Sequence, residues 1–360
     1  MEGGSCTLRH EFWQVLEEAR LESFGFRYAL VLDEDDTPLA CAAFYVVTTD
    51  VAIFGPGPLR RAIAAIRRFF PGFLRLRLLE CGTPVTLTAP PIGTAGAALS
   101  PEILAALDEL LLQAAVRDRA MVIVVRDFEP AAQALLDRFG RLGYRAVEGL
   151  PNTYLDIRWR TPGQYLAGLK SYFRSKLLRH ARRTQALGIR DERVGDFGAL
   201  APELCAQWSV VHLGASEFQR EVLTPGFYRA LSALPGERSM ALLFRRGEDL
   251  VAHALLLRDG DLLRWLYFGR REAANDSLYI HAAHRVIETA IELGVKRLEM
   301  GLTTYAVKRD LGASLVPIRL AIRARWRFAS GLVALGYRLL NRVPPVRAKP
   351  VFLDPESGEA

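Results

Sequence analysis

Hydrophobic and polar residues alternate along the chain in blocks that predict strands and helices in a mixed order. In the first half, residues 26–32 and 39–48 are predicted strands joined by the acidic turn 33–38, which is the pattern of a β-hairpin. Residues 121–126 are almost wholly apolar, which is typical of a strand buried on both faces. Helix-periodic segments lie between the strands, and a long one follows Ser100, a favourable N-cap. The first half is therefore predicted to be an α/β domain.

The second half repeats this order of elements. It begins with a helix near Thr161, continues through further helices, and then places three predicted strands close together, at 240–245, 250–258 and 262–268. Residue identity between the halves is weak. The shared order nevertheless predicts an internal duplication, and hence two tandem domains.

The segment 276–318 closes the second half. Apolar residues at helical spacing lead into a short strand at 296–300, and Gly301 follows at once. A polar turn and then Lys308 come before another apolar strand, which begins at Leu315. This order of helix, strand, loop with a lysine, and strand can hold an anionic group against the edge of a sheet.

Length, composition and charge fit this picture. A chain of 360 residues fits two domains of average size, and a composition that is 50% hydrophobic and 24% charged is globular. The net charge of +7 is compatible with an anionic partner such as a nucleotide, coenzyme A, tRNA or a membrane surface. A general preference for arginine would produce the same excess.

Four cysteines are scattered without the spacing of a disulfide framework or a zinc site: Cys6, Cys41, Cys81 and Cys205. The N-terminal residues contain no apolar stretch of signal-peptide length, and no apolar run approaches the roughly 20 residues of a membrane span. A cytoplasmic protein is therefore expected.

Three stretches of the second half, taken together, resemble the FemAB-like members of the GNAT-fold acyltransferase superfamily over residues 161–323. They are SYFRSKLLRHARRTQALGI, GEDLVAHALLLRDGDLLRWLYFG and DSLYIHAAHRVIETAIELGVKRLEMGLTTYAVKRDLG. The last is similar to the family's pattern of a helix, A-x-x-x-G, a short strand, a glycine, and then a lysine just before a glycine.

The resemblance implies an α/β fold with two tandem GNAT-like domains, each a twisted mixed sheet flanked by helices. The expected division is an N-terminal, degenerate, acceptor-binding domain at 1–158, a catalytic domain at 159–326, and a C-terminal basic helix and tail at 327–360. It also implies an acyltransferase in which an amine attacks an activated carbonyl directly. The sequence contains no nucleophile elbow of the G-x-S-x-G type, which agrees with direct transfer.

The acyl donor stays open. The resemblance allows acyl-CoA, an acyl-carrier protein or an aminoacyl-tRNA as co-substrate, no tightly bound cofactor, and a small-molecule or lipid-linked amine as acceptor. Ordinary GNAT enzymes bind the pyrophosphate of coenzyme A with a Q/R-x-x-G-x-G/A loop at a helix N-terminus. The corresponding stretch, Gly269 to Ser277, has no such glycine pair, and Gly55-Pro56-Gly57 has the wrong order. A tRNA-dependent, peptide-bond-forming transferase and a non-catalytic binding protein both remain alternatives.

Four residues are candidates for catalysis. The resemblance places Lys308 near a phosphate or the reacting carbonyl of the substrate, where a compact cation would stabilise negative charge; a solvent-facing lysine is the alternative. Tyr305 could protonate a leaving group, and Glu299 could accept the proton of the attacking amine unless it pairs with Arg297. His253 could act as a base, although a hydrogen-bonded core histidine is commoner.

Five residues are candidates for substrate binding. Tyr267 lies where the resemblance expects the central strands to separate, and Ser277 could cap the next helix or donate to a phosphate. Arg174, Arg179 and Arg182 lie on a basic helix that could bind the phosphates of tRNA or of a nucleotide-linked substrate, or could simply face solvent.

Two further features bear on partners. His281 and His284 are spaced i, i+3 without a third ligand at a recognisable spacing, so no metal site is predicted. Residues 323–342 interleave arginines with aromatic and aliphatic residues, which predicts either peripheral contact with an anionic membrane or a helix packed on the domain with its arginines extended into solvent. The oligomeric state stays open.

Overall fold

A computed structural model describes the protein over residues 5–21, 24–54, 57–85, 90–96, 99–214, 221–236, 238–272, 277–341 and 349–353. Parts of three segments from the sequence lie outside these ranges. They are residues 55–56 of the Gly-Pro-Gly stretch, residues 273–276 of the stretch from Gly269 to Ser277, and residues 342–348 and 354–360 near the C-terminus. The chain forms two compact units. Unit 1 comprises residues 1–10, 22–151 and 316–345, and unit 2 comprises 11–21, 152–315 and 346–360.

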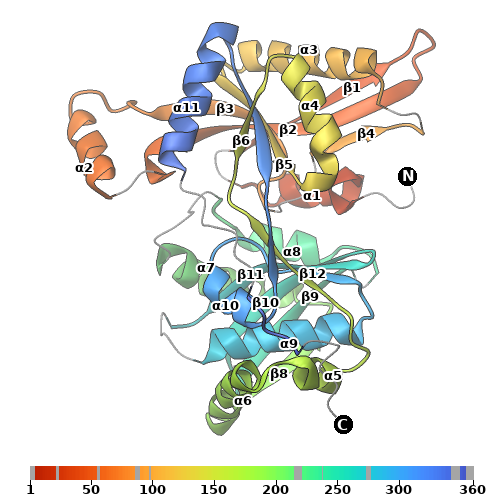
Figure 1. The fold of residues 1–360 in the computed structure, drawn as a ribbon, viewed down its shortest axis with the longest axis vertical. Helices are drawn as coiled ribbons and strands as arrows, with labels where there is room; N and C mark the ends of the chain where they lie inside the picture. Colours follow the sequence, from red (N-terminus) through yellow and green to blue (C-terminus); the bar gives the residue numbers. More distant parts are fainter. Residues whose placement is uncertain are drawn as a thin grey trace. The chain divides into compact units, whose positions relative to one another are not determined.

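Unit 1 is built on a seven-stranded mixed sheet, sheet A, in the order β1-β2-β3-β5-β14-β6, with β4 beside β2 (Figure 1). Its strands are β1 (Gly25–Leu32), β2 (Pro38–Asp50), β3 (Arg75–Cys81), β4 (Ile92–Thr94), β5 (Val122–Phe128), β6 (Arg145–Glu148) and β14 (Arg319–Ala324). Its helices are α2 (Gly57–Ile66), α3 (Pro101–Arg117), α4 (Gln133–Arg141) and α11 (Ser330–Leu340), with 3-10 turns η1 (Cys6–Leu8), η2 (Val51–Phe54), η3 (Pro130–Ala132) and η5 (Arg327–Ala329).

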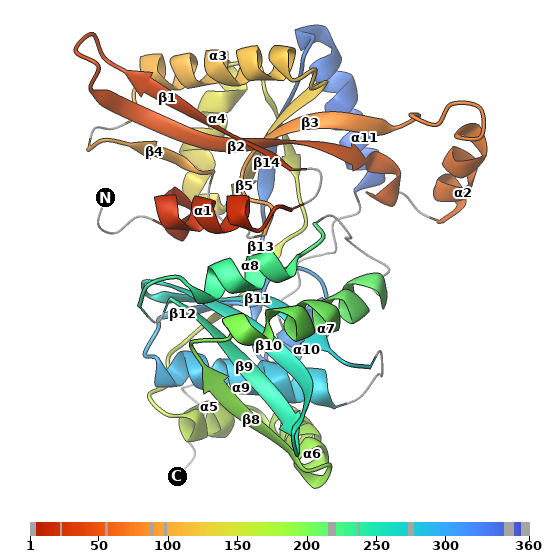
Figure 2. The same cartoon turned by 180° about the vertical axis from the view of Figure 1, so that it is seen from behind.

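The two faces of sheet A are covered by different helices. The helix α3 begins at the predicted cap, where the Ser100 side chain accepts a hydrogen bond from the backbone N–H of Ile103 at 3.2 Å. With α4 it buries one face of the sheet, whereas α11 packs on the other face through Ala334 (Figure 2). The strand β5 is buried at every position, as its apolar sequence predicts.

Unit 2 is built on a second seven-stranded mixed sheet, sheet B, in the order β13-β7-β12-β11-β10-β9-β8. Its strands are β7 (Asn152–Asp156), β8 (Ile189–Val194), β9 (Ser239–Arg246), β10 (Asp249–Asp259), β11 (Leu262–Arg270), β12 (Arg297–Glu299) and β13 (Ser314–Val316). Its helices are α1 (His10–Glu18), α5 (Pro162–Gly168), α6 (Ser171–Ala186), α7 (Ala201–Gly214), α8 (Pro225–Ser232), α9 (Leu278–Glu292) and α10 (Tyr305–Asp310), with the 3-10 turn η4 (Gly198–Leu200).

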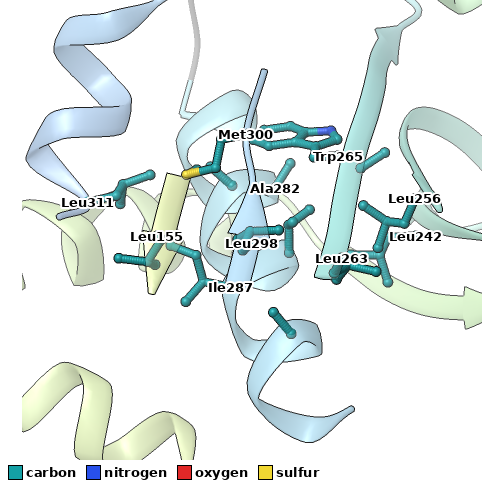
Figure 3. Close-up of a cluster of buried hydrophobic side chains, with 14 of the residues drawn as sticks. Leu155, Leu242, Leu256, Leu263, Trp265, Ala282, Ile287, Leu298, Met300 and Leu311 are labelled. Carbon is teal, nitrogen blue, oxygen red and sulfur yellow. The ribbon is translucent and has the colours of Figure 1, made fainter. Parts of the chain in front are cut away.

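The core of unit 2 lies between sheet B and α9. Leu263, Leu298 and Ile287 are fully buried there, with further side chains from β7, β9 and β10 (Figure 3). The helix α6 packs against α9, while α7 and α8 pack against β11 and β9. Burial of these apolar side chains is the main favourable term for this unit, at about 25 cal/mol for each Å² removed from water.

The two sheets share one strand order. In sheet A, β1, β2 and β3 form an antiparallel run, and β5 then lies parallel to β3. In sheet B, β9, β10 and β11 form the same antiparallel run, and β12 lies parallel to β11. The strand after the parallel pair is antiparallel in both sheets. The internal duplication predicted from the order of elements therefore corresponds to two sheets of matching topology.

The observed division of the chain differs from the predicted boundaries at 158 and 326. The strand β7 precedes the helices of unit 2 in the chain and joins sheet B, whereas β14 follows unit 2 and joins sheet A between β5 and β6. The helix α1 also belongs to unit 2. Apolar periodicity identifies a strand but does not identify its partner, so these exchanges were outside what the pattern could predict.

Candidate active site

The site lies where the parallel strands β11 and β12 stop pairing. The strand β12 pairs with β11 only from Leu262 to Arg264, and β11 then continues to Arg270. Beyond Arg264, the edge of β11 toward β12 has no ladder partner among the strands that the structure describes. An unpaired strand edge presents backbone N–H and C=O groups that a ligand can use.

A β-bulge lies on the same part of β11. The pairing of β10 with β11 runs from Leu255 opposite Tyr267 directly to Leu256 opposite Trp265, so Leu266 has no opposite residue. A bulge bends its strand, increases the local twist and redirects side chains, and such bulges are common beside active sites. Here the bulge lies just beyond Arg264, the last residue of β11 that pairs with β12.

A cavity of about 480 Å³ occupies the place where the strands separate. Five aromatic residues and several aliphatic ones line it, together with a small number of polar groups. The lining residues are Trp208, Val211, His212, Glu221, Trp265, Leu266, Tyr267, Phe268, Arg270, Tyr279, Ile280, Met300, Gly301, Leu302, Thr303, Thr304, Val307 and Lys308. An apolar cavity with a few placed polar groups is the usual form of a small-molecule site.

The turn after β12 forms one wall of the cavity and has an uncommon backbone conformation. Gly301, Thr303 and Thr304 have φ values of 73°, 62° and 50°, all in the left-handed region. Glycine adopts this region freely, but a β-branched residue does so only when its surroundings hold it there. Strain of this kind clusters at ligand sites, which supports a functional role for the turn.

Lys308 holds this turn. It lies on the short helix α10 and is buried, with 3% of its surface exposed, rather than facing solvent from a loop. Its Nζ donates hydrogen bonds to the carbonyl oxygens of Leu302 at 2.6 Å and Gly301 at 3.0 Å. The carbonyl of Gly301 also accepts a bond from the Thr153 hydroxyl. One buried cation and one hydroxyl therefore fix the first residues of the strained turn.

Burial lowers the pKa of Lys308 to about 7, and the nearby carboxylate of Glu299 only partly opposes the shift. Glu299 itself does not line the cavity. It is buried, pairs with Arg264 and accepts a hydrogen bond from the Asn152 amide at 3.0 Å. Arg264 in turn bonds Asp259 at 3.0 Å. The predicted proton acceptor thus lies in a buried charge network, and its expected partner, Arg297, contacts the ring of Tyr154 instead.

Tyr267 lies in the cavity wall, as the sequence analysis expected. Its hydroxyl donates to Glu221 Oε1 at 2.9 Å, and its ring packs edge-on against Trp208. Burial and the neighbouring carboxylate of Glu221 raise the pKa of Tyr267 well above its usual value. The tyrosine is therefore neutral at physiological pH and orients the carboxylate of Glu221 at the edge of the cavity.

His212 is a cavity residue that the sequence analysis did not single out. It stacks on Trp208 with ring centroids 4.4 Å apart, and burial lowers its pKa. An imidazole that is neutral near pH 7 can accept a proton. Periodicity could not distinguish it from the other polar positions of α7, because the strand separation that exposes it involves distant segments.

His253 lies in the core rather than in the cavity. Its Nδ1 is 3.0 Å from Gln207 Oε1 and its Nε2 is 3.2 Å from the Tyr228 hydroxyl. The Gln207 amide nitrogen donates to Leu250 O, so the histidine donates through Nδ1 and accepts through Nε2. Burial lowers the pKa of His253 to about 3. This arrangement matches the alternative of a hydrogen-bonded core histidine.

Tyr305 and Ser277 lie close to the cavity in sequence but do not line it. Tyr305 is the first residue of α10, and Ser277 precedes α9 without a capping hydrogen bond from its side chain. The Ser277 hydroxyl lies 2.9 Å from Nδ1 of His180 on α6, so it links two helices. Their predicted roles in chemistry and binding stay predictions.

The basic helix α6 is also separate from the cavity lining. Arg179 and Arg182 are exposed, and Arg174 is half-buried. Leu177 and Ala181 are buried on the opposite face. The helix therefore presents a positively charged outer face, and anion binding by its arginines stays a prediction.

No group of three or more His, Cys, Asp or Glu side chains that could hold a metal ion occurs in the described part of the chain. The buried pair His281 and His284 on α9 faces Asp191 and Glu288 at 4.0 and 3.6 Å, and burial lowers the pKa of both histidines. Within the same described ranges, no helix has the length and apolar character needed to cross a membrane.

Comparison with known proteins places the cavity within a recognised domain. Residues 171–309 match the family model described as the acetyltransferase (GNAT) domain. A Mycobacterium tuberculosis protein (strain H37Rv), provisionally named 8-amino-7-oxononanoate synthase 2, is 29% identical over 319 residues, which cover 86% of this chain and 41% of that protein. The chain thus spans about two fifths of the length of this curated relative.

Solved structures resemble both units together. FemX is similar with a TM-score of 0.54 and 14% identity, over 88% of this chain and 92% of its own. The C-terminal domain of a provisionally named lysylphosphatidylglycerol synthetase from Agrobacterium fabrum has a TM-score of 0.55 and 11% identity, over 93% and 92%. L-PGS from Bacillus licheniformis has a TM-score of 0.54 and 11% identity, over 93% and 95%. At these identities the likeness shows a shared fold.

Proposed function

We propose that this chain is an N-acyltransferase whose reaction takes place in the cavity of unit 2, because residues 171–309 match the GNAT acetyltransferase domain model and the fold resembles that of FemX. An activated acyl or aminoacyl group would be transferred directly to an amine. One observation carries the proposal. The cavity opens between the separated ends of β11 and β12, where the bulge at Leu266 and the strained turn after Met300 meet.

The chemistry requires a nitrogen lone pair to attack the donor carbonyl, a new C–N bond to form, and the bond to the leaving group to break. Backbone N–H groups along the unpaired edge of β11 would donate to the oxyanion of the tetrahedral intermediate. His212 would accept the proton that the nitrogen loses, because burial lowers its pKa and keeps it neutral. The proton then returns to the leaving thiolate or alkoxide.

Lys308 would act in this scheme by holding the turn in shape. Two of the three N–H donors of an ammonium account for its bonds to Gly301 and Leu302. The remaining N–H would reach an oxygen of the donor inside the cavity that Lys308 lines. A phosphate or a developing negative charge on the reacting carbonyl are the groups that this cation would favour.

For the donor we propose acyl-CoA, an acyl-carrier protein or an aminoacyl-tRNA. The aromatic wall formed by Trp208, Trp265 and Tyr279 would pack against the acyl or aminoacyl side chain. FemX and L-PGS share the fold, which keeps the aminoacyl-tRNA alternative in view.

One class of acceptor is favoured by a specific observation. The relative from M. tuberculosis is named for 8-amino-7-oxononanoate, which has an amine beside a ketone on a chain that ends in a carboxylate. Arg270 lines the cavity and would pair with such a carboxylate, while Phe268 and Ile280 would contact the chain. We therefore propose amino-keto carboxylates as candidate acceptors, alongside small-molecule and lipid-linked amines.

The test is to incubate the full chain with acetyl-CoA, long-chain acyl-CoA or charged tRNA and a panel of amines that includes 8-amino-7-oxononanoate, and to detect amide products by mass spectrometry. Loss of product after ribonuclease treatment identifies a tRNA donor. His212→Ala should lower turnover by about a hundredfold or more, as for loss of a general base. Leu213→Ala is the matched control, because Leu213 follows on α7 and is 76% exposed.

The proposal fails if a donor binds but neither wild type nor any variant forms an amide with any amine in the panel. Binding without product would support the alternative of a non-catalytic GNAT-fold binding protein. Equal loss of activity in the His212 and Leu213 variants would exclude His212 as the proton acceptor.

A further inference from the structure

Two segments of unit 1 contain arginines and no acidic residues. Residues 51–79 include six arginines and neither Asp nor Glu, and residues 316–345 have the same counts. Acidic residues are otherwise frequent in this chain, which has 40 of them. These two basic segments come from distant parts of the sequence and belong to the same compact unit.

The first basic segment exposes a row of apolar side chains. The helix α2 buries only Ile63, and the turn that follows it leaves Phe69 and Phe70 81% and 67% exposed. Leu59 and Ile66 are exposed on the helix at positions that continue the same row.

This segment is nevertheless fixed to the sheet. Arg67 bonds both carboxylate oxygens of Asp50, at 2.5 and 2.6 Å, and donates to the carbonyl of Phe73 at 2.8 Å. The aromatic residues are therefore presented by an anchored element at the end of β2. Arg60, Arg61 and Arg68 are exposed beside them.

The second basic segment has the same character. One face of α11 packs on sheet A through Ala334, while Leu332, Leu335 and Leu339 on the opposite face are exposed at helical spacing. Phe328, just before the helix, is 85% exposed. Arg325, Arg327 and Arg338 are exposed around this row. Both views of unit 1 place α2 and α11 toward the same end of sheet A, away from the tip of the β1–β2 hairpin (Figures 1 and 2).

We propose that the exposed rows of α2 and α11, which together we term the basic apolar surface, bind an anionic lipid membrane. Aromatic and aliphatic side chains would enter the interfacial region, and the arginines would contact lipid phosphates. This proposal is independent of the reaction proposed for unit 2.

The charge of the surface decides between a membrane and a second copy of the chain. A symmetric dimer through this surface would place arginines of one copy near arginines of the other, and neither basic segment supplies a carboxylate to pair with them. An anionic bilayer satisfies both the arginines and the apolar rows. A nucleic acid would satisfy only the arginines, because exposed leucines and phenylalanines without base-stacking geometry gain little from it.

The test is co-sedimentation of the full chain with vesicles of phosphatidylcholine alone and of an equimolar mixture of phosphatidylcholine and phosphatidylglycerol. We expect binding to the mixed vesicles, weaker binding to the neutral ones, and partial loss at high salt. The double variant Phe69→Ser/Phe70→Ser and the triple variant Leu332→Ser/Leu335→Ser/Leu339→Ser should each weaken binding by about tenfold or more. Each removes exposed apolar area that the membrane would bury. Circular dichroism will establish that each variant is folded.

The matched control is Tyr28→Ser/Leu30→Ser, because both residues lie on β1 of the same unit and are each 53% exposed. It should bind mixed vesicles like the wild type. The proposal is overturned if the wild type binds neither kind of vesicle, or if the control weakens binding as much as the surface variants do. It is also overturned if light scattering shows a dimer that the Phe69→Ser/Phe70→Ser change dissociates.

Discussion

Both units contain a pair of parallel neighbouring strands, β11–β12 in sheet B and β3–β5 in sheet A, yet the carboxyl ends of these two pairs are occupied differently. In sheet B, β12 is short, β11 is bulged, and a cavity lies between their ends. In sheet A, β3 and β5 pair from Leu78 to Cys81 on one side and from Val122 to Val125 on the other. A buried polar cluster lies at that end instead.

The cluster in sheet A is centred on Arg126. Its Nη1 donates to the Tyr45 hydroxyl at 2.8 Å and lies 3.3 Å from Glu80 Oε2, while the Tyr45 hydroxyl donates to the same carboxylate at 2.8 Å. A Cβ on Gly82 would meet the Arg126 side chain at 3.0 Å. The arginine therefore fills space next to the turn after β3, at the position where sheet B has its cavity.

The contrast shows that matching topology does not by itself create a site. Sheet B separates because its second parallel strand ends after three residues and its first is bulged, and Lys308 then holds the exposed turn from outside the strands. In sheet A the parallel ladder ends after Cys81 and Val125, and Arg126, a cation from within the strand β5, lies at that end. That the first domain is degenerate as a catalyst stays a prediction.

The largest expected effect comes from removing the cation of sheet A. Arg126→Met would leave the carboxylate of Glu80 buried without its partner, and should lower the free energy of unfolding by about 3–5 kcal/mol. Urea unfolding measures the loss, and hydrogen exchange of peptides from β3 and β5 will localise it to unit 1. Glu80→Gln/Arg126→Met is the matched control and should cost less, because the charge of Glu80 is removed together with the cation, and only the ion pair of Arg126 with Asp127, at 3.6 Å, is then lost without compensation. A loss below about 1 kcal/mol for the single variant would mean that the cluster does not stabilise sheet A.

Removing the cation of sheet B should affect activity, because Lys308 lines the cavity. Lys308→Met takes away two hydrogen bonds to the turn that lines the cavity, so we expect turnover to fall about a hundredfold, the scale reported for loss of one preorganised donor. Steady-state kinetics will separate two roles for Lys308. A fall in kcat at constant KM indicates that Lys308 acts in the transition state, through the turn or on the reacting carbonyl, whereas a rise in KM for the donor indicates that it contacts the donor already in the ground state.

The control for Lys308 is Lys296→Met. Lys296 is 80% exposed and pairs with Asp261 on the surface, so its loss should leave both kcat and KM unchanged. Wild-type activity in the Lys308 variant would contradict the role of the turn in the reaction.

A pair of glycines gives a closer comparison of the two strand ends. A Cβ at Gly269 on β11 would lie 2.2 Å from His253 Cε1 and 2.7 Å from the backbone nitrogen of Trp208. Gly269→Ala should therefore cost about 3 kcal/mol, whereas Gly82→Ala in sheet A, with contacts of 3.0 to 3.3 Å to a side chain, should cost about 1 kcal/mol. Urea unfolding of both variants measures this. If the two variants lose the same free energy of unfolding, the groups around Gly269 move aside as easily as the Arg126 side chain does next to Gly82.

Much of the fold could be predicted from the sequence. Apolar periodicity located helices and strands in both halves. The resemblance of the second half to a GNAT domain is confirmed by the family match at residues 171–309, and the fold is similar to that of FemX. The exchange of β7 and β14 could not be predicted, because the register of a strand depends on partners that are distant in sequence.

The site was predictable only in part. Lys308 and Tyr267, two of the candidate residues from the sequence, lie in the cavity wall, and their roles in the reaction stay predictions. Trp208, His212 and Glu221 were missed, since each lies on a segment that meets the cavity only after sheet B and α7 have packed together. Local sequence does not encode the bulge that brings these segments to one cavity.

The last comparison concerns the chemical difference between the two cations. The guanidinium of Arg126 stays charged at every accessible pH, but burial lowers the pKa of Lys308 to about 7 from its usual value of 10.5. Above about pH 7 the unfolded chain therefore binds a proton that the folded chain has lost, so this group makes the protein more stable as pH rises toward 10. The slope should reach about 1.4 kcal/mol per pH unit for the wild type relative to Lys308→Met. Urea unfolding of both proteins at several pH values between neutrality and pH 9.5 or so measures it.

Arg126→Met should show the same slope as the wild type, because that cation does not titrate. If the stabilities of the wild type and Lys308→Met change in parallel with pH, the lysine keeps an ordinary pKa. The turn beside the cavity is then held by a permanent charge, as Arg126 holds the strand end in sheet A.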